Sequence, residues 1–234
     1  YRFRGHSDTE VLLYGCHHWG VERTIARLNG MFAFALWDSE ERTLTLARDR
    51  LGKKPLYFPR TPRSFLFASE LRPLMLHPDC PHEIDRSSVA SLLRTHYIAA
   101  PFSIFQGVEK LEPGEMLVVK PSGEVSRNRY WSLLERAEAA MTNPWRGTPD
   151  EAVDAAEALI SDATRLGLVS DVPLGAMLSG GVDSSTVVAM MQRHSSNAVR
   201  TFSIGYTEED YDEAPHARAV AEHLGTDHTE LIAQ

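Results

Sequence analysis

The first half of the chain combines short apolar runs with polar turns, a pattern that predicts several short strands. The run 31–37 has bulky side chains at successive positions, so we expect a strand that is buried on both faces. Residues 43–47 alternate in hydrophobicity and should pair with this strand as a hairpin across the polar turn 38–41. Further strands are predicted at 56–58 and 65–68, and a second hairpin is predicted from 116–120 and 125–131.

Helices are predicted where apolar residues recur at a spacing of three to four. Ser7 or Asp8 can cap the first helix, and Asp85 or Ser87 can cap the last helix of this half. The expected ranges are 8–16, 21–28, 71–76 and 84–97.

The pattern changes after residue 149. A helix begins at Pro149 and has a long apolar face. Apolar strands then alternate with helices, which predicts a doubly wound parallel sheet. The predicted strands are 172–178, 199–205 and 226–232, and the helices between them begin near 182 and at Tyr211. The fold class is therefore α+β in a first domain, 1–140, and α/β in a second, 150–234, with a linker at about 132–149.

Composition narrows the function classes. The chain has 234 residues, 43% of them hydrophobic and 24% charged, as in ordinary soluble globular proteins. A net charge of −8 argues against nucleic acid as the main partner, and no apolar run is long enough to span a membrane. The cysteines, Cys16 and Cys80, do not form a disulfide framework, so we expect a cytoplasmic location.

The sequence Ser-Gly-Gly-Val-Asp-Ser-Ser at 179–185 joins an apolar strand to a helix and predicts a phosphate-binding turn. Paired glycines let the backbone approach an anion, and the first helical turn offers free N–H groups. Asp183 would repel phosphate unless Mg²⁺ lies between them, so we predict that it holds that metal. The predicted phosphate-binding residues are Ser179, Gly180, Gly181, Asp183, Ser184 and Ser185.

The alternative for this stretch is a strand end with glycines, in which Asp183 and Ser184 serve only as helix N-caps. No Gly-Lys-Ser or Gly-Lys-Thr follows the glycines, so the turn is not of the Walker type. It resembles instead the PP-loop of ATP pyrophosphatases, which cleave ATP between the α- and β-phosphates.

The first half resembles the glutaminase domain of glutamine-hydrolysing asparagine synthetases. The matching segments are Ser7-Asp8-Thr9-Glu10-Val11, 28–35, Arg48-Asp49-Arg50-Leu51-Gly52, 55–57 and Phe67-Ala68-Ser69-Glu70, in the family's order. The resemblance implies an N-terminal-nucleophile α/β/β/α domain (partial) followed by a PP-loop domain (partial).

The resemblance also implies roles for single residues. Asp8 would bind the α-amino group of glutamine, although a plain helix N-cap is the alternative. Leu178 and Ile204 would contact the adenosine of ATP. The nucleophilic cysteine and the arginine that binds the glutamine carboxylate would lie before Tyr1, so we expect an internal piece of a longer protein that does not hydrolyse glutamine by itself.

Two charged segments have two interpretations each. Arg48 and Asp49 either brace the glutaminase loop or form a surface turn pair of little energetic weight. Asp212 and Glu213 suit the start of a helix, and a metal-binding role is the alternative.

The implied function is an ATP-dependent carbon–nitrogen ligase, a glutamine-hydrolysing asparagine synthetase. The implied cofactors and partners are ATP, Mg²⁺, glutamine and aspartate or a related carboxylate, with a homodimer as one option for the assembly. The alternatives are an amidotransferase that acts on a surface-polysaccharide sugar, a ring-closing enzyme similar to β-lactam synthetases, and a non-catalytic binding protein on the same fold. The acceptor pocket would be built mainly from residues after Gln234.

Overall fold

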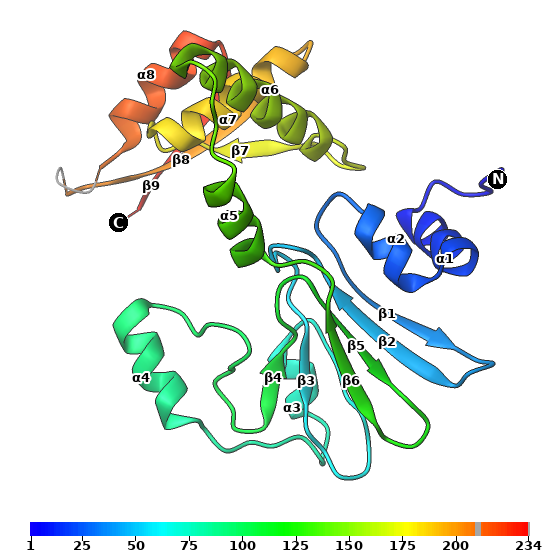
Figure 1. The fold of residues 1–234 in the computed structure, drawn as a ribbon. Helices are drawn as coiled ribbons and strands as arrows, with labels where there is room; N and C mark the ends of the chain where they lie inside the picture. The colour runs from blue at the N-terminus through cyan, green and yellow to red at the C-terminus, as the bar shows by residue number, and fades with distance from the viewer. Residues whose placement is uncertain (209–211, 234) are drawn as a thin grey trace. The chain divides into compact units, whose positions relative to one another are not determined.

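The chain forms two compact units, Tyr1–Asn143 and Pro144–Gln234 (Figure 1). The computed structural model describes residues 1–208 and 212–233. The predicted helix start at Tyr211 and the last residue, Gln234, lie outside the described residues. The division between the units falls within the range 132–149 that the sequence marks as a linker.

A four-stranded antiparallel sheet forms the body of the first unit. Its order is β1 (Ala33–Asp38), β2 (Thr43–Arg48), β5 (Glu115–Val119) and β6 (Val125–Arg129) (Figure 1). Both predicted hairpins are confirmed, because β1 pairs with β2 and β5 pairs with β6. The prediction of a fully buried first strand is wrong: β1 is an edge strand, and Trp37 is 59% exposed.

A smaller antiparallel pair, β3 (Tyr57–Pro59) and β4 (Val108–Lys110), belongs to the same unit. The predicted strand 65–68 is wrong, since this segment contributes only an isolated bridge between Tyr57 and Ala68. β4 was not predicted, because only three residues form it and their partner lies about fifty positions earlier in the chain. The two sheets share a buried apolar cluster of Leu46, Leu56, Phe58, Leu111 and Leu117.

Helices occupy the remaining parts of the first unit. The side chain of Ser7 accepts a hydrogen bond from the backbone N–H of Thr9 and so caps α1. Asp85 caps α4 in the same way, as predicted. One helix, α5, lies inside the predicted linker, so that range is not without structure. The helices are α1 (Asp8–Trp19), α2 (Val21–Arg27), α3 (Leu71–Met75), α4 (Arg86–Thr95) and α5 (Leu133–Thr142).

The second unit has the predicted parallel sheet, with a crossover helix between successive strands (Figure 1). The helix predicted from Pro149 begins there, with Thr148 and Glu151 forming a reciprocal capping box. In chain order the elements are α6 (Pro149–Gly167), β7 (Gly175–Met177), α7 (Val182–His194), β8 (Arg200–Tyr206), α8 (Ala214–Leu224) and β9 (Asp227–Ala233).

Buried and exposed residues alternate along β8, so its two faces have different surroundings. Thr201 and Ser203 are buried on one face, whereas Phe202 and Ile204 are partly exposed on the other. An apolar cluster that includes Leu178 of the strand end, Val188 of α7 and two alanines of α8 lies within this unit. The small side chains of α8 allow it to pack closely against its neighbours.

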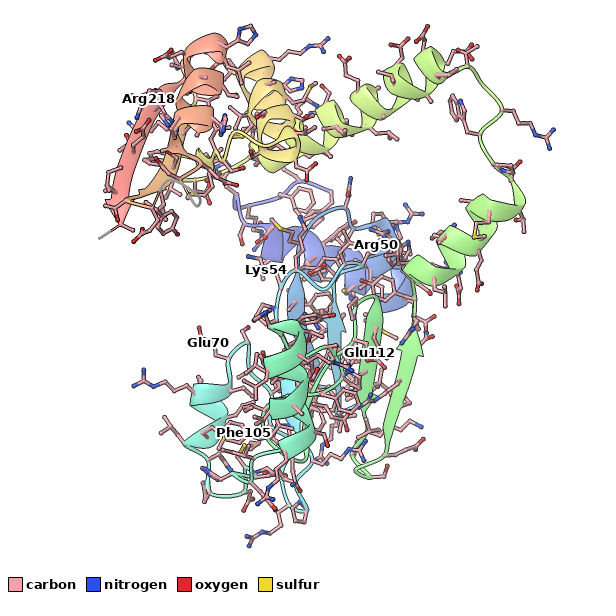
Figure 2. The ribbon with its side chains drawn as sticks, turned by 90° about the vertical axis from the view of Figure 1, so that its left-hand side faces the viewer. Arg50, Lys54, Glu70, Phe105, Glu112 and Arg218 are labelled. Carbon is pink, nitrogen blue, oxygen red and sulfur yellow. The ribbon has the colours of Figure 1, made fainter. Side chains whose placement is uncertain are left out.

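Polar contacts also attach α8 to the sheet. Arg218 of α8 donates two hydrogen bonds to Glu230 of β9, at 2.8 and 2.6 Å (Figure 2 labels Arg218). These bonds lower the pKa of the Glu230 carboxyl group.

In the described part of the chain, no helix is long and apolar enough to cross a membrane.

Candidate functional site

The first unit contains a pocket of about 620 Å³ near the N-terminal end of α1. Its walls come from the first turn of α1, the segment between α2 and β1, and two short loops. These parts are distant in sequence, so only the folded chain brings them together. The lining residues are Asp8, Thr9, Leu12, Leu28–Phe34, Lys54, Pro55 and Ser69.

Asp8 lines this pocket, and it is not the cap of α1. Ser7 occupies the N-cap position, so the alternative reading of Asp8 as a plain cap is wrong. In the described residues its carboxylate has a single side-chain partner, the hydroxyl of Thr9 at 3.5 Å. A carboxylate with so few partners at a pocket wall can accept hydrogen bonds from a cationic ligand.

A buried carboxylate fixes the loop that forms another wall of the pocket. Asp49 is 2% exposed and accepts four backbone N–H hydrogen bonds. Two of them come from Leu51 and Lys53 to one oxygen, at 3.2 and 3.0 Å, and two come from Phe32 and Lys54 to the other, at 3.3 and 3.0 Å. Asp49 therefore braces the loop 49–54 against the start of β1.

Two arginines brace the same loop through carbonyl groups. Arg48 donates to the carbonyl oxygens of Lys54, Leu111 and Gly52, at 2.8, 2.5 and 2.5 Å. Burial lowers the pKa of the Arg48 guanidinium. Arg50 donates to the carbonyl groups of Leu28 and Ala26, at the end of α2 (Figure 2). The alternative of a surface pair is therefore wrong for Arg48 and Asp49.

Neither cysteine contributes to this pocket. Cys16 is 8% exposed and Cys80 is 3% exposed. Burial raises the pKa of both thiols, so both are weak nucleophiles at neutral pH. Neither thiol is placed to serve as the nucleophile of a glutaminase, in agreement with the sequence.

In the second unit, the glycine turn lies at the carboxyl end of β7. Gly180 has φ +78, in the left-handed region that favours glycine. A Cβ there would lie 2.6 Å from the backbone carbon of His216, so the turn fits closely against α8. Gly181 is the N-cap of α7, and no side chain caps the helix. Asp183 and Ser184 are thus not N-caps, and the first-turn N–H groups have no side-chain cap.

Three serine hydroxyl groups surround this turn. Ser179 and Ser184 contact each other at 2.9 Å between their hydroxyl oxygens. The N–H of Gly181 donates to Ser179 at 3.3 Å. The hydroxyl oxygen of Ser185 is buried and has no hydrogen-bond partner among the described residues. A buried hydroxyl without a partner is costly, and a bound phosphate oxygen would satisfy it.

The other predicted nucleotide contacts differ in their accessibility. Asp183 is exposed in the first turn of α7, and its carboxylate has no hydrogen-bond partner in the described part of the chain. Ile204 is 46% exposed near the carboxyl end of β8, so its side chain is accessible. Leu178 is 2% exposed and lies in the apolar cluster. A contact between Leu178 and a nucleotide would therefore have to come from its backbone.

The chemistry of the donor set is compatible with Mg²⁺ bound together with phosphate. Among the described residues there is no group of three or more His, Cys, Asp or Glu that could hold a metal by themselves. Mg²⁺ commonly takes only one or two carboxylates and completes its shell with phosphate oxygens and water. Asp183 could supply one such carboxylate. Asp212 instead accepts hydrogen bonds from the N–H groups of Tyr206 and Ala214, as expected at a helix start.

Sequence reasoning identified Asp8 alone among the polar residues of the pocket and missed the others, among them Lys54 and Ser69. Lys54 lies next to Pro55–Tyr57, and Ser69 lies within Phe67–Glu70; both segments carry the family resemblance. That resemblance was the available signal for these two residues. Their position could not be inferred, because no local pattern indicates that these loops lie beside α1.

Comparisons with known proteins show which families the two parts of the chain match. Residues 1–131 match the family model of the glutamine amidotransferase domain, and residues 155–234 match that of asparagine synthase. The chain is 34% and 32% identical to asparagine synthetases [glutamine-hydrolyzing] 3 and 1 of Bacillus subtilis, over 99% of its length in both cases. It is 32% identical, over 95% of its length, to putative asparagine synthetase [glutamine-hydrolyzing] 2 of Methanocaldococcus jannaschii. It spans only 39%, 35% and 42% of these relatives.

Proposed function

Because this chain belongs to the glutamine amidotransferase domain family, we propose that it is part of a glutamine-hydrolysing, ATP-dependent asparagine synthetase. In the whole protein, glutamine supplies ammonia and ATP activates the side-chain carboxylate of aspartate. The products are asparagine, glutamate, AMP and pyrophosphate. The observation that carries the proposal is the glycine turn, which no side chain caps and whose buried Ser185 hydroxyl has no partner among the described residues; it follows a glutaminase-type unit in the same chain.

The pocket of the first unit supports the glutaminase part of the proposal. Asp8 offers a carboxylate with few partners, which suits the ammonium group of an amino acid. The apolar and amide-bearing walls suit the rest of a glutamine molecule, and a volume of about 620 Å³ leaves room for it. Neither Cys16 nor Cys80 is proposed as the nucleophile, since both thiols are buried.

The glycine turn supports the ATP-dependent part. The free N–H groups at the start of α7, together with the hydroxyls of Ser179, Ser184 and Ser185, can donate hydrogen bonds to the phosphate oxygens that become pyrophosphate. Asp183 would hold Mg²⁺ beside these oxygens, and the ion would neutralise charge as pyrophosphate leaves. Ile204, at the end of the neighbouring strand, is accessible to the adenosine.

The acceptor is the least constrained part of the proposal. An enzyme that amidates a sugar carboxylate would use both the glutamine pocket and the glycine turn. A ring-closing enzyme would need only the ATP site at the glycine turn. Aspartate is favoured because the relatives that match most of this chain carry the name asparagine synthetase. Mg²⁺ as the metal, a cytoplasmic location and a homodimer also stay predictions.

The test uses the full-length protein and the substitution Asp183→Ala. We expect pyrophosphate release from Mg-ATP to fall by two orders of magnitude or more, since charge stabilisation at a leaving group is typically worth roughly 10²–10³ in rate. Hydrolysis of glutamine to glutamate should continue. Asp171→Ala, an exposed aspartate before β7, is the matched control and should leave both reactions unchanged.

The two reactions report on different parts of the proposal. Continued pyrophosphate release in Asp183→Ala would refute the role of Asp183 at the ATP site. Measuring pyrophosphate release with aspartate, with a sugar carboxylate and without an acceptor identifies the substrate class. Absence of Mg-ATP binding by the unmodified protein would favour a non-catalytic protein on this fold.

A further inference from the structure

The pocket beside α1 carries one charged group of each sign. Among its lining residues, Asp8 is the single carboxylate and Lys54 is the single cation. In the described part of the chain, the ammonium group of Lys54 has neither an ion pair nor a hydrogen bond, and it does not pair with Asp8. Each of the two opposite charges therefore remains available to a ligand.

The other basic residues of the same loop are not available in this way. Arg48 and Arg50 use their guanidinium groups to hold backbone carbonyls. Lys53 is exposed but does not line the pocket. Lys54 is thus distinguished from its neighbours by its position at the pocket wall (Figure 2 labels Lys54).

The backbone of Lys54 is fixed although its side chain is exposed. Its N–H donates to the buried carboxylate of Asp49 at 3.0 Å, and its carbonyl accepts from Arg48 at 2.8 Å. Pro55 follows and restricts the chain further. A binding group on a fixed backbone loses less entropy when a ligand binds. The buried Arg48–Asp49 pair thereby positions a lysine for ligand binding.

We propose that Lys54 binds the α-carboxylate of the amino-acid substrate while Asp8 binds its α-amino group. This inference rests on the proposed glutaminase function of the pocket. Asp8 and Lys54 line one pocket, and neither has an ion-pair partner among the residues that the structure describes, so together they match the two charges of a zwitterionic amino acid. The sequence resemblance also implies an arginine that binds this carboxylate. Lys54 would then be a second cation on the same carboxylate, which has lone pairs for several donors.

The experiment measures binding by calorimetry to the full-length protein, with the glutaminase nucleophile replaced by alanine in every variant so that glutamine is bound but not consumed. The ligands are L-glutamine, L-glutamine α-amide, which lacks the carboxylate, and N-acetyl-L-glutamine, which lacks the amino charge. Lys54→Met removes the ammonium group and keeps much of the side-chain volume. Lys53→Met is the matched control, because Lys53 also donates its N–H to Asp49 but lies outside the pocket wall.

We expect Lys54→Met to weaken L-glutamine binding about three- to tenfold, the range for a partly exposed charge-assisted hydrogen bond. Binding of the α-amide should be unchanged in the same variant. Lys54→Arg should retain most of the affinity for glutamine, and Lys53→Met should bind like the unmodified protein. N-acetylation should weaken binding to the unmodified protein and have less effect in Asp8→Asn.

Two negative results have different meanings. If Lys54→Met binds glutamine like the Lys53→Met control, or loses glutamine and α-amide binding equally, the role of Lys54 is wrong and the glutamine pocket stands. If the unmodified protein binds no L-glutamine, both the glutaminase proposal and the role of Lys54 are overturned. Equal melting temperatures of Lys54→Met and Lys53→Met will establish that the difference is not one of folding.

Discussion

The buried carboxylate of Asp49 gives a prediction whose magnitude follows from its contacts. In Asp49→Asn one acceptor oxygen becomes an NH₂ group of nearly the same size. Two backbone N–H groups, either those of Phe32 and Lys54 or those of Leu51 and Lys53, then lose their acceptor and face a donor. At about 1.5 kcal/mol for each hydrogen bond to a charged group, the substitution should destabilise the first unit by about 3 kcal/mol.

The same substitution at Asp38 is the matched control. One oxygen of Asp38 accepts from the N–H groups of Glu40 and Glu41, at 2.9 and 3.0 Å, in the exposed turn after β1. An asparagine can keep both bonds there, and water can satisfy any group that is lost. We therefore expect Asp38→Asn to change stability by less than about 0.5 kcal/mol.

The assay for both variants is amide hydrogen exchange by mass spectrometry, because the two units need not unfold together. Peptides that cover residues 48–55 and the start of β1 should exchange faster in Asp49→Asn than in Asp38→Asn. Peptides of the second unit should be unchanged in both variants. Equal protection of residues 48–55 in the two variants would refute the conclusion that Asp49 braces this loop.

Three further predictions each concern the substitution of a single residue. Tyr130 donates its hydroxyl hydrogen to the carbonyl of Arg48 at 2.6 Å, so Tyr130→Phe should destabilise the first unit by about 1 kcal/mol in urea denaturation. Burial raises the pKa of Tyr130 to about 12, so its contribution is present up to pH 10 and is lost as the pH rises from 10 to 12. Tyr130→Phe should lack that component, and an equal alkaline loss in both proteins would contradict this. Gly180→Ala should be destabilising by more than about 2 kcal/mol in thermal unfolding, because strain at φ +78 adds to the contact with α8. Ser185→Ala should weaken Mg-ATP binding without loss of stability, because it removes a hydroxyl that has no partner among the described residues.

Gly225→Ala is the control for Gly180→Ala. Gly225 has φ +67, and nothing lies within 4 Å of the position that a Cβ would take. Its substitution should cost only the backbone strain, about 1 kcal/mol. Equal losses at the two positions would contradict the close packing of the glycine turn against α8. For Ser185→Ala, a loss of stability with unchanged Mg-ATP binding would contradict the proposed ligand role.

Local patterns predicted most elements of both units. Apolar runs beside polar turns identified both hairpins, and the cap candidates Ser7 and Asp85 marked helix starts correctly. The capping signals are reliable because each hydrogen bond connects residues only two positions apart, and the hairpin signals are reliable because each joins two consecutive strands across a short turn. The glycine turn was found in the same way, as a short motif between a strand and a helix.

The errors arose where distant residues decide the outcome. The apolar run 31–37 predicts a buried strand, but among the described residues no further strand pairs with the free edge of β1. The segment 65–68 has strand-like residues but lacks a continuous partner. The helix α5 was read as linker because its surroundings contain turn-forming residues. In each case the local pattern did not specify the neighbour.

The candidate sites also contain some features that local sequence predicts and others that depend on distant residues. The sequence by itself determined the glycine turn, the two domain types and Asp8 as a candidate. Only the tertiary structure brought Lys54 to the wall of the pocket that contains Asp8. The groups that hold this wall are far apart in the chain: Asp49 and Phe32 are separated by 17 positions, and Arg48 and Leu111 by 63. No local rule encodes such pairs, because their geometry depends on how the sheets and loops pack around one another.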